Sequence, residues 1–216
     1  MKTIIFDLDG TLYRFGNGSY HGSRLERVVL KKAEKYIGAR LSKAPDAARL
    51  ILQEIIGKYR EEISLGLETE FGLNRDDYFR TVWDIPARGL VRREKALRET
   101  LLKLQEKYRL VLLSDSATAW ILNVLRFLEV QDIFQSHIFS GEKDVSKSLL
   151  NAFPEIVRRL RTAPADCIVV GDQEATDIIP ARSIGMKTVF IHPVRESRVA
   201  DLNITAVRDL LRHDLG

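Results

Sequence analysis

This chain of 216 residues has little cysteine and no long apolar run, and each of these absences excludes a class of protein. There is one cysteine, Cys167, so no internal disulfide can form, and we expect the reducing environment of the cytoplasm. No apolar run is long enough to cross a bilayer, and the apolar stretch at the N-terminus breaks at Asp7, so neither a membrane span nor a signal peptide is expected. With 45% hydrophobic and 30% charged residues, the composition is that of an ordinary globular protein.

A strong excess of one charge is also absent. Lysine and arginine number 34 against 30 aspartates and glutamates, which gives a net charge of +4. Opposite charges alternate along the predicted helices, as in Arg92-Arg93-Glu94-Lys95, and this pattern is typical of solvated helix faces. Nucleic acid is therefore not expected as the main partner, whereas a small anionic ligand suits the mildly basic charge.

The sequence does contain apolar, β-branched runs that alternate with helical patterns. The first run ends at Asp7, and the others span 109–113, 137–140, 167–170 and 187–191. Strands that alternate with helices predict an α/β fold, a doubly wound parallel sheet covered on both faces. The helices of this part are predicted over 92–107, 118–128, 148–161, 177–184 and 205–212.

The region 14–88 differs from the rest, because it has helical patterns and few strand signals. Helices are predicted over 24–36 and 45–59, and a third begins after Asn74 as its N-cap and ends before Pro86. We therefore expect an α/β core made of residues 1–13 and 89–216, with an all-helical cap of residues 14–88 inserted into it.

Polar residues follow the predicted strands at their carboxyl ends, where parallel sheets hold their ligands. Two carboxylates as close as Asp7 and Asp9 repel each other unless a cation or a proton lies between them. The pair is typical of a divalent metal site in which one carboxylate attacks phosphorus. The residues expected at this edge are Asp7, Asp9, Ser114, Asp115, Lys147, Asp172 and Asp177.

Taken alone, some of these residues have simpler interpretations. Ser114 would cap a strand end, and Asp177 would be an acid favoured at a helix N-terminus. Lys147 would be a solvated lysine, with Lys143 as a nearby competitor for any role in a site. Their order after successive strands favours one shared site instead.

In that order, the residues resemble the four motifs of the haloacid dehalogenase superfamily phosphatases. The resemblance implies a doubly wound core with an inserted helical cap, and it covers the chain up to about residue 191 except for the cap. The matching positions are Asp7-Leu8-Asp9-Gly10-Thr11-Leu12, Ser114, Lys147, and Gly171-Asp172 with Asp177.

The resemblance also implies roles for the four aspartates. Asp7 would be the nucleophile that forms an aspartyl-phosphate, and it would also bind Mg²⁺. Asp9 would be the acid/base, and its backbone carbonyl would bind the metal. Asp172 would be the second carboxylate on Mg²⁺, while Asp177 would order Lys147 or a metal-bound water.

The phosphate would be held by Ser114, Lys147 and backbone N–H groups, including that of Asp115. The family commonly has asparagine where Asp115 stands, and a carboxylate beside a phosphate is unfavourable unless it turns away or meets a cation. The role of the Asp115 side chain therefore stays open. Ser148 also departs from the pattern, because proline is common there.

The acid at Asp9 favours hydrolysis of a small phosphomonoester, because dehalogenases that resemble this pattern lack it. Tyr13 and the stretch 78–86 loosely resemble pyrimidine 5′-nucleotidase-like enzymes, which suggests a nucleoside monophosphate as substrate. A phosphoglycolate phosphatase-like enzyme is the main alternative. Tyr78 and Trp83 would stack on a base or pack internally. A phosphotransferase or mutase with the same residues and a non-catalytic binding module also stay open, as do a monomer and a homodimer.

Overall fold

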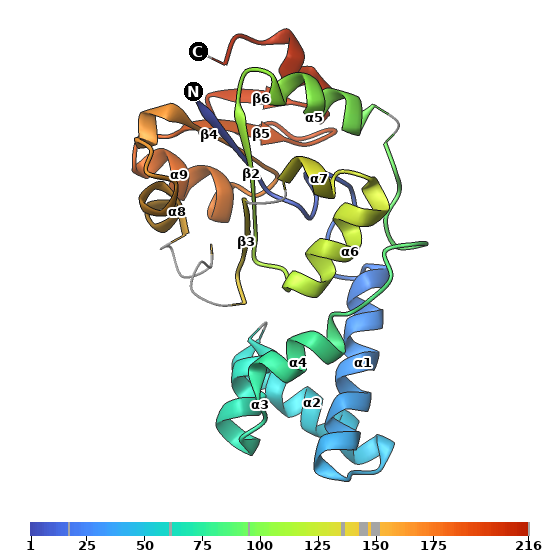
Figure 1. Cartoon of the computed structure of the whole chain (residues 1–216). Coiled ribbons are helices and arrows are strands. Elements are labelled where there is room, and N and C mark those ends of the chain that lie inside the picture. The colour runs from blue at the N-terminus through green and yellow to red at the C-terminus, as the bar shows by residue number, and fades with distance from the viewer. Residues whose placement is uncertain are drawn as a thin grey trace.

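The structure, a computed structural model, describes residues 1–16, 18–60, 62–94, 96–134, 137–142, 147 and 152–215. Within these residues, six parallel strands form one sheet in the order β3-β2-β1-β4-β5-β6 (Figure 1). The strands are β1 Thr3–Phe6, β2 Arg109–Ser114, β3 Ile138–Ser140, β4 Cys167–Gly171, β5 Lys187–Ile191 and β6 Leu202–Ile204.

β1 lies in the middle of the sheet, with β2 on one side and β4 on the other. Thr3 is in register with Arg109 of β2 and with Cys167 of β4. All three strands run in the same direction, so their carboxyl ends meet at one edge of the sheet. From β1 the chain continues to β2 on one side, and after β3 it crosses to β4 on the other side of β1. The edge where the strand order reverses in this way is where ligands bind in open α/β sheets.

Successive side chains of β1 point to opposite faces of the sheet, and each face has its own apolar core. Ile4 and Phe6 lie in the larger cluster, which includes side chains of the helices over the first face, whereas Ile5 packs with the helices over the other. The first face is covered by α5 Leu97–Gln105, α6 Thr118–Leu128, α7 Gln131–Phe134 and the 3₁₀ helix Val207–Arg212. The second is covered by α8 Ala152–Leu160 and α9 Ile179–Ser183.

Four helices stand together beyond the sheet (Figure 1). They are α1 Arg24–Leu41, α2 Pro45–Tyr59, α3 Ile63–Phe71 and α4 Arg75–Val82. Ser23 caps the first of them by accepting a hydrogen bond from the backbone N–H of Glu26 at 3.0 Å. Asn123 of α6 links this group to the sheet side, since its amide donates to Asp84 at 2.9 Å and to the carbonyl of Ile85 at 3.1 Å.

The doubly wound parallel sheet predicted from the sequence is confirmed, and several elements have the predicted bounds. The helices 45–59 and 118–128 are present as α2 and α6. The N-cap at Asn74 is confirmed by a 2.9 Å hydrogen bond from the backbone N–H of Asp77. Of the predicted helix 148–161, residues 148–151 lie outside the described part of the chain, and α8 forms over the rest.

Other predictions of secondary structure were wrong. The segment 205–212 is mainly a 3₁₀ helix. In place of the predicted helix 177–184, α9 spans only Ile179–Ser183, and a π-helical turn over Glu174–Ile178 precedes it. α5 begins at Leu97 rather than at 92, because the charged residues before it bring few apolar groups to the core. α3, α7 and β6 were missed, since α7 and β6 have only four and three residues and α3 buries the small residues Ser64 and Gly66.

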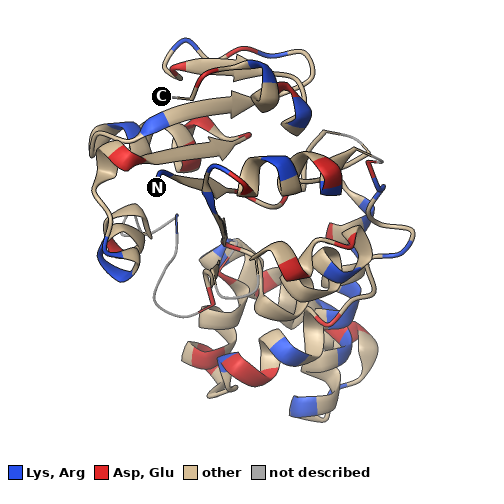
Figure 2. Cartoon of the chain, turned by 45° about the horizontal axis from the view of Figure 1, so that its top comes forward, with Lys and Arg blue, Asp and Glu red and all other residues tan. Residues whose placement is uncertain are grey.

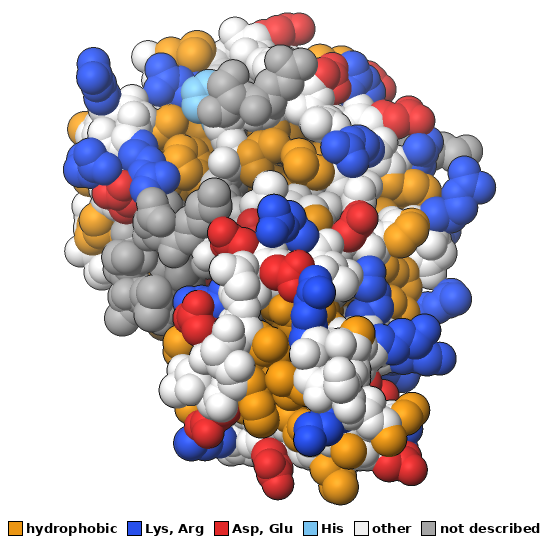
Figure 3. All heavy atoms as spheres, turned by 60° about the horizontal axis from the view of Figure 1, so that its bottom comes forward, with side chains coloured by type: hydrophobic (Ala, Val, Ile, Leu, Met, Phe, Trp, Pro, Cys, Tyr) orange, Lys and Arg blue, Asp and Glu red, His pale blue; other side chains and the backbone are white. Residues whose placement is uncertain are grey.

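Charged residues of both signs are interspersed along the helices (Figure 2). Several pair with each other, as Arg40 does with Asp77 at 2.7 Å and Lys103 with Glu99 at 2.7 Å. On the face seen in Figure 3, hydrophobic side chains lie in patches separated by polar and charged ones. In the part of the chain that the structure describes, no helix is both long and apolar enough to span a membrane.

Candidate active site

Asp7 continues directly from the buried central strand. Its backbone N–H donates to the carbonyl of Val170 at 2.9 Å, so the residue is still tied to β4, and its side chain is only 7% exposed. Three residues later the chain turns at Gly10, where φ is +100° and an added Cβ would lie 2.1 Å from Oδ2 of Asp172. Only glycine allows both this backbone conformation and this close approach to Asp172.

The end of β4 brings Asp172 and Asp177 to the same place. A Cβ on Gly171 would lie 2.3 Å from the carboxyl carbon of Asp177, so the absence of a side chain lets Asp177 fold back against the strand end. Asp177 is 1% exposed, and its Oδ2 accepts a hydrogen bond from the backbone N–H of Gln173 at 3.0 Å. The π-helical turn that contains Asp177 therefore fixes the carboxylate against β4.

Lys147 joins these carboxylates through a buried ammonium group. Its Nζ lies 2.6 Å from Oδ1 of Asp7 and 2.7 Å from Oδ1 of Asp177, and the side chain is 5% exposed. The competing Lys143 lies outside the described residues. Among the described residues, Lys147 is thus the lysine that the fold brings to the end of β1.

Asp115 holds the backbone of this lysine. Its Oδ1 accepts a hydrogen bond from the N–H of Lys147 at 2.7 Å, although the two residues are 32 positions apart. The carboxylate is therefore turned toward the Lys147 segment, which gives the side chain a structural contact that the sequence left open. Ser148, the other departure from the motif pattern, lies outside the described residues.

Three carboxylates of this edge form a cluster that could hold a metal ion. Asp7, Asp172 and Asp177 each offer an oxygen, and these atoms lie within 4.8 Å of one another. Among the described residues, Oδ2 of Asp7 and Oδ1 of Asp172 are buried and have no hydrogen-bond partner. A buried carboxylate oxygen without a partner is costly, and a cation with a preference for hard oxygens such as Mg²⁺ would satisfy both atoms.

The charges of the cluster also favour a bound cation. Burial raises the pKa of Asp7 well above its usual range; the positive charge of Lys147 lowers it, and the neighbouring Asp177 and Asp172 raise it further. Burial, followed by the charge of Asp177, raises the pKa of Asp172 to about 7. Burial opposes the charge on Lys147, but Asp177 and Asp7 outweigh it and raise the pKa of the ammonium group. One buried cation thus faces three carboxylates, and the cluster is short of positive charge.

Asp9 points its carboxylate to a different set of partners. Oδ1 accepts hydrogen bonds from the hydroxyl of Tyr13 and from Nε1 of Trp120, the latter at 2.9 Å. Oδ2 accepts from the hydroxyls of Ser116 at 2.6 Å and Ser114 at 3.2 Å. The sequence suggested the backbone carbonyl of Asp9, not its carboxylate, as a metal ligand, and among the described residues the carboxylate lies outside the acidic cluster.

Two of these partners of Asp9, Trp120 and Ser116, were missed as site residues in the sequence. Trp120 occurs among the apolar residues of α6 and carries no sign of a polar role, because its contact with Asp9 exists only in the folded chain. Ser116 follows Ser114 by two positions, and that repetition of hydroxyls after β2 was the available signal. Burial, together with the neighbouring charge of Asp9, raises the pKa of Tyr13 well above its usual range.

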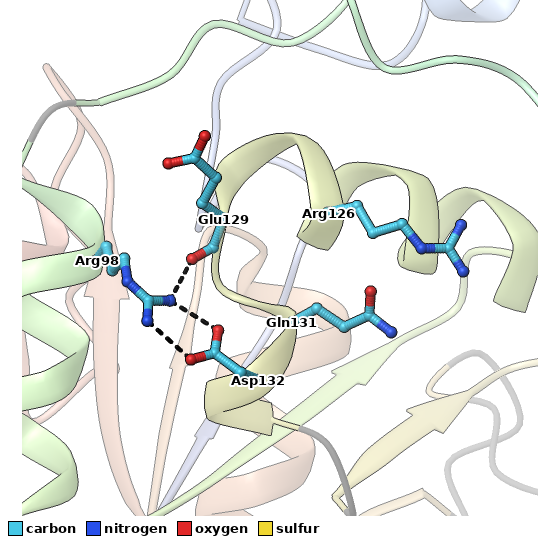
Figure 4. A pocket seen from close by; sticks show the side chains of 5 residues that line it. All are labelled: Arg98, Arg126, Glu129, Gln131 and Asp132. Carbon is cyan, nitrogen blue, oxygen red and sulfur yellow. Dashed lines mark hydrogen bonds and ion pairs between the residues drawn. The ribbon is translucent and has the colours of Figure 1, made fainter.

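A surface depression of about 580 Å³ adjoins the acidic cluster. Asp172 forms part of its wall together with Gln173, Phe190 and Arg195. A second depression, of about 540 Å³, is lined by none of the candidate site residues, and in it Arg98 is bound to both carboxylate oxygens of Asp132 and to the Glu129 carbonyl (Figure 4). The site therefore lies at the strand ends and not in the second depression.

A buried lysine and three clustered carboxylates at the central strand ends of a parallel α/β sheet thus form the candidate active site. The model of the haloacid dehalogenase-like hydrolases matches residues 1–185. The chain belongs to this family.

Relatives and solved structures of the same family cover most of the chain. The chain is 28% identical to the glyceraldehyde 3-phosphate phosphatase of Pyrococcus furiosus, over 88% of this chain and 80% of that one. It is 25% identical to the enzyme of the same name from Methanothermobacter thermautotrophicus, over 97% and 96% of the two chains. A phosphatase structure from Thermococcus onnurineus has a TM-score of 0.66 at 21% identity, over 98% of this chain and 97% of that one, and the similarity supports the fold.

Proposed function

We propose that this chain is a Mg²⁺-dependent phosphatase that hydrolyses a small phosphomonoester through an aspartyl-phosphate on Asp7. The observation that carries the proposal is the position of the Asp7 carboxylate. One of its oxygens is bound to the ammonium of Lys147 at 2.6 Å, and the other is buried without a hydrogen-bond partner among the described residues. The carboxylate also belongs to the cluster with Asp172 and Asp177. The Asp7 carboxylate therefore faces one fixed cation and keeps one oxygen that could bind a second.

The chain is a phosphomonoester hydrolase of the haloacid dehalogenase-like family. The family model covers residues 1–185, and the curated relatives described above are phosphatases. The proposal adds the metal, the covalent intermediate and the roles of single residues to this classification.

The proposed metal ligands are Asp7 and Asp172, with the backbone carbonyl of Asp9 as suggested by the family resemblance. Among the described residues, one buried oxygen of each carboxylate has no hydrogen-bond partner, and carboxylate oxygens are ligands that Mg²⁺ prefers. The bound ion would offset the charge of the carboxylates and of the phosphoryl group. Asp177 is proposed to position Lys147, since its two oxygens already accept from Lys147 and from the Gln173 backbone.

The proposed reaction has two steps. In the first, a carboxylate oxygen of Asp7 bonds to phosphorus, the bond to the ester oxygen breaks, and Asp9 gives a proton to that leaving oxygen. In the second, water attacks the same phosphorus, Asp9 takes up the proton of the water, and phosphate leaves while the Asp7 carboxylate is restored. Lys147 and Ser114 would offset the negative charge that is spread over the phosphoryl oxygens.

The substrate is proposed to be a small phosphorylated metabolite, with glyceraldehyde 3-phosphate as the first compound to test because the curated relatives carry that name. A nucleotide substrate has less support, because the two aromatic residues considered for stacking on a base pack against other side chains of the chain. Tyr78, one of the two aromatic residues considered for stacking on a base, is 2% exposed and packs edge-on against Tyr36 with ring centres 5.4 Å apart. Trp83 stacks on Tyr20 at 6.4 Å and is partly buried.

Residues 14–88 are proposed as the cap that closes over this substrate. Helices α1–α4 fill this segment, and the contacts of Asn123 with Asp84 and Ile85 mark where the segment meets the core. Such a cap would exclude water from the reacting groups and supply contacts to the leaving group. A cytoplasmic location, and a monomer or homodimer without membrane or nucleic-acid partners, stay predictions.

Release of inorganic phosphate tests the proposal. The panel contains glyceraldehyde 3-phosphate, phosphoglycolate, UMP, CMP and sugar phosphates, each with Mg²⁺ and with EDTA, and each also with added sugar acceptors. We expect Mg²⁺-dependent release of phosphate, its loss in Asp7→Asn, and no loss in the control Asp46→Asn, whose side chain is 95% exposed on α2. Transfer to an acceptor in place of phosphate release would identify a phosphotransferase, and undiminished turnover of Asp7→Asn would refute the proposal.

A further inference from the structure

The two carboxylate oxygens of Asp9 have partners of different kinds. Oδ1 accepts from Nε1 of Trp120 at 2.9 Å and from the hydroxyl of Tyr13. Oδ2 accepts from the hydroxyl of Ser114, which lies at the end of β2 and is a proposed phosphate ligand, and from the hydroxyl of Ser116. One oxygen is thus directed toward aromatic side chains and the other toward the proposed phosphate site.

The donors to Oδ1 are buried and come from separate elements. Trp120 is 0% exposed within α6, and Tyr13 is 4% exposed in the turn that follows β1. The indole Nε1 can only donate, so it holds an acceptor and cannot reverse its role. Both donors therefore fix Oδ1 from the protein interior.

The orientation of the Tyr13 ring is itself fixed by packing. Its ring meets that of Trp120 edge-on with centres 6.4 Å apart, and it meets Phe15 edge-on at 5.4 Å. The backbone closes the same turn, because the N–H of Gly10 donates to the carbonyl of Tyr13 at 3.0 Å. A hydroxyl on a ring held in this way has little freedom to leave Asp9.

We propose that Tyr13 and Trp120 are positioning residues that anchor Oδ1 of Asp9, so that Oδ2, beside Ser114, is the oxygen that exchanges the proton with the leaving group and with water. In this proposal both residues act through Asp9 and not by contact with the substrate. The inference rests on the proposed function, because it requires Asp9 to act as the acid/base of phosphoryl transfer.

The experiment compares two leaving groups. An alkoxide needs a proton as the ester bond breaks, whereas p-nitrophenolate leaves readily without one, so the loss of a well-placed acid affects alkyl esters far more. The parameter is kcat/KM, because it reports the steps up to departure of the leaving group and not the later hydrolysis of the common intermediate. The substrates are the fastest alkyl phosphate of the panel above and p-nitrophenyl phosphate.

The variants are Tyr13→Phe and Trp120→Phe, with Tyr36→Phe as the matched control. Tyr36 is also a buried tyrosine whose hydroxyl donates to an aspartate, Asp77, at 2.9 Å, but it lies on α1. For Tyr13→Phe we expect kcat/KM to fall about tenfold or more with the alkyl ester and less than about threefold with p-nitrophenyl phosphate. Trp120→Phe should likewise lower kcat/KM more with the alkyl ester than with p-nitrophenyl phosphate. Tyr36→Phe should change kcat/KM equally with the two substrates or not at all.

A double variant separates positioning from a general structural effect. If Tyr13 acts through Asp9, Tyr13→Phe should have no further effect on kcat/KM in the Asp9→Asn background, because coupled residues are not additive. Tyr13→Phe removes a single oxygen, so it keeps the test valid even if Trp120→Phe fails to fold. Equal losses with the two substrates, or a full Tyr13→Phe loss in the Asp9→Asn background, would overturn the inference alone. If Asp9→Asn itself fails to distinguish the two leaving groups, the acid role in the proposed function fails, and the inference fails with it.

Discussion

The ammonium nitrogen of Lys147 lies 2.6 Å from Oδ1 of Asp7, although the two residues are 140 positions apart in the chain. Both side chains are at least nine-tenths buried, and Lys147 also binds Asp177 at 2.7 Å. A pair of this kind is expensive to desolvate, and it leaves an uncompensated buried charge when one member is removed. Because this pair lies at the end of the central strand, within the candidate active site, removal of one partner should affect both stability and activity.

Replacement of Lys147 should damage both. We expect Lys147→Ala to lower the free energy of unfolding by about 3 kcal/mol, because Asp7 and Asp177 lose their shared buried cation. The rate of phosphate release should fall about 100-fold or more, since a donor aimed at the phosphoryl oxygens is lost. Urea unfolding and steady-state kinetics give the two values. The control Lys103→Ala removes an exposed ion pair with Glu99 and should leave both unchanged; an equal effect of the two variants would contradict the prediction.

The stability of the metal-free protein should fall as pH rises toward neutrality. Burial, followed by the charge of Asp177, raises the pKa of Asp172 from 3.8 to about 7. Between these values the folded chain keeps a proton that the unfolded chain has lost, so the free energy of unfolding decreases with increasing pH. Thermal unfolding in EDTA from about pH 5 to about pH 7 should show a falling Tm.

Added Mg²⁺ and the variant Asp172→Asn provide the controls for this pH effect. A cation that binds the carboxylate only in the folded state should raise Tm and reduce the decline. Asp172→Asn should reduce the decline in EDTA, because the titrating group is gone. The same slope under all three conditions would show that Asp172 does not carry the effect.

The contact between Asp115 and the backbone N–H of Lys147 needs an acceptor oxygen and not a negative charge. Asp115→Asn should therefore keep kcat/KM within about threefold, whereas Asp115→Ala should lower it about tenfold because the Lys147 segment loses its tether. Steady-state kinetics on the two variants decides the matter. If Asp115→Asn is as impaired as Asp115→Ala, the carboxylate charge itself is required.

Gly171 should tolerate no side chain. An added Cβ would lie 2.3 Å from the carboxyl carbon of Asp177, so Gly171→Ala should displace Asp177 from Lys147 and lower the free energy of unfolding by about 1–3 kcal/mol. Gly57 of α2 is the matched control, because nothing lies within 4 Å of a Cβ added there. Gly57→Ala should stabilise the protein by about 0.5–1 kcal/mol through its helix propensity. The prediction is wrong if the unfolding curves of the two variants shift in the same direction.

The position of the site followed from the sequence because strand ends are determined locally. Each apolar run stops at a polar residue, and the parallel order of β1, β2 and β4 brings those residues to one edge. Asp7, Asp172 and Asp177 were placed in one site on that basis, and the structure clusters them.

The partners of Asp9 did not follow from the sequence, because they depend on tertiary contacts. Trp120 has the position of an ordinary core residue of α6, and only the folded chain brings its Nε1 within 2.9 Å of Asp9. The direction of the Asp115 carboxylate was open for the same reason. Short elements such as β6 were missed because three residues give too little periodicity to detect.

Chemical identification of the phosphorylated residue is the most direct test of the central claim. The enzyme is mixed with its best substrate and Mg²⁺, quenched in acid within the first turnover, and digested for peptide mass analysis. We expect the mass of one phosphoryl group on the peptide that contains Asp7, and its absence in Asp7→Asn. Phosphate release with no such modification, or with the phosphoryl group on another residue, would contradict the account.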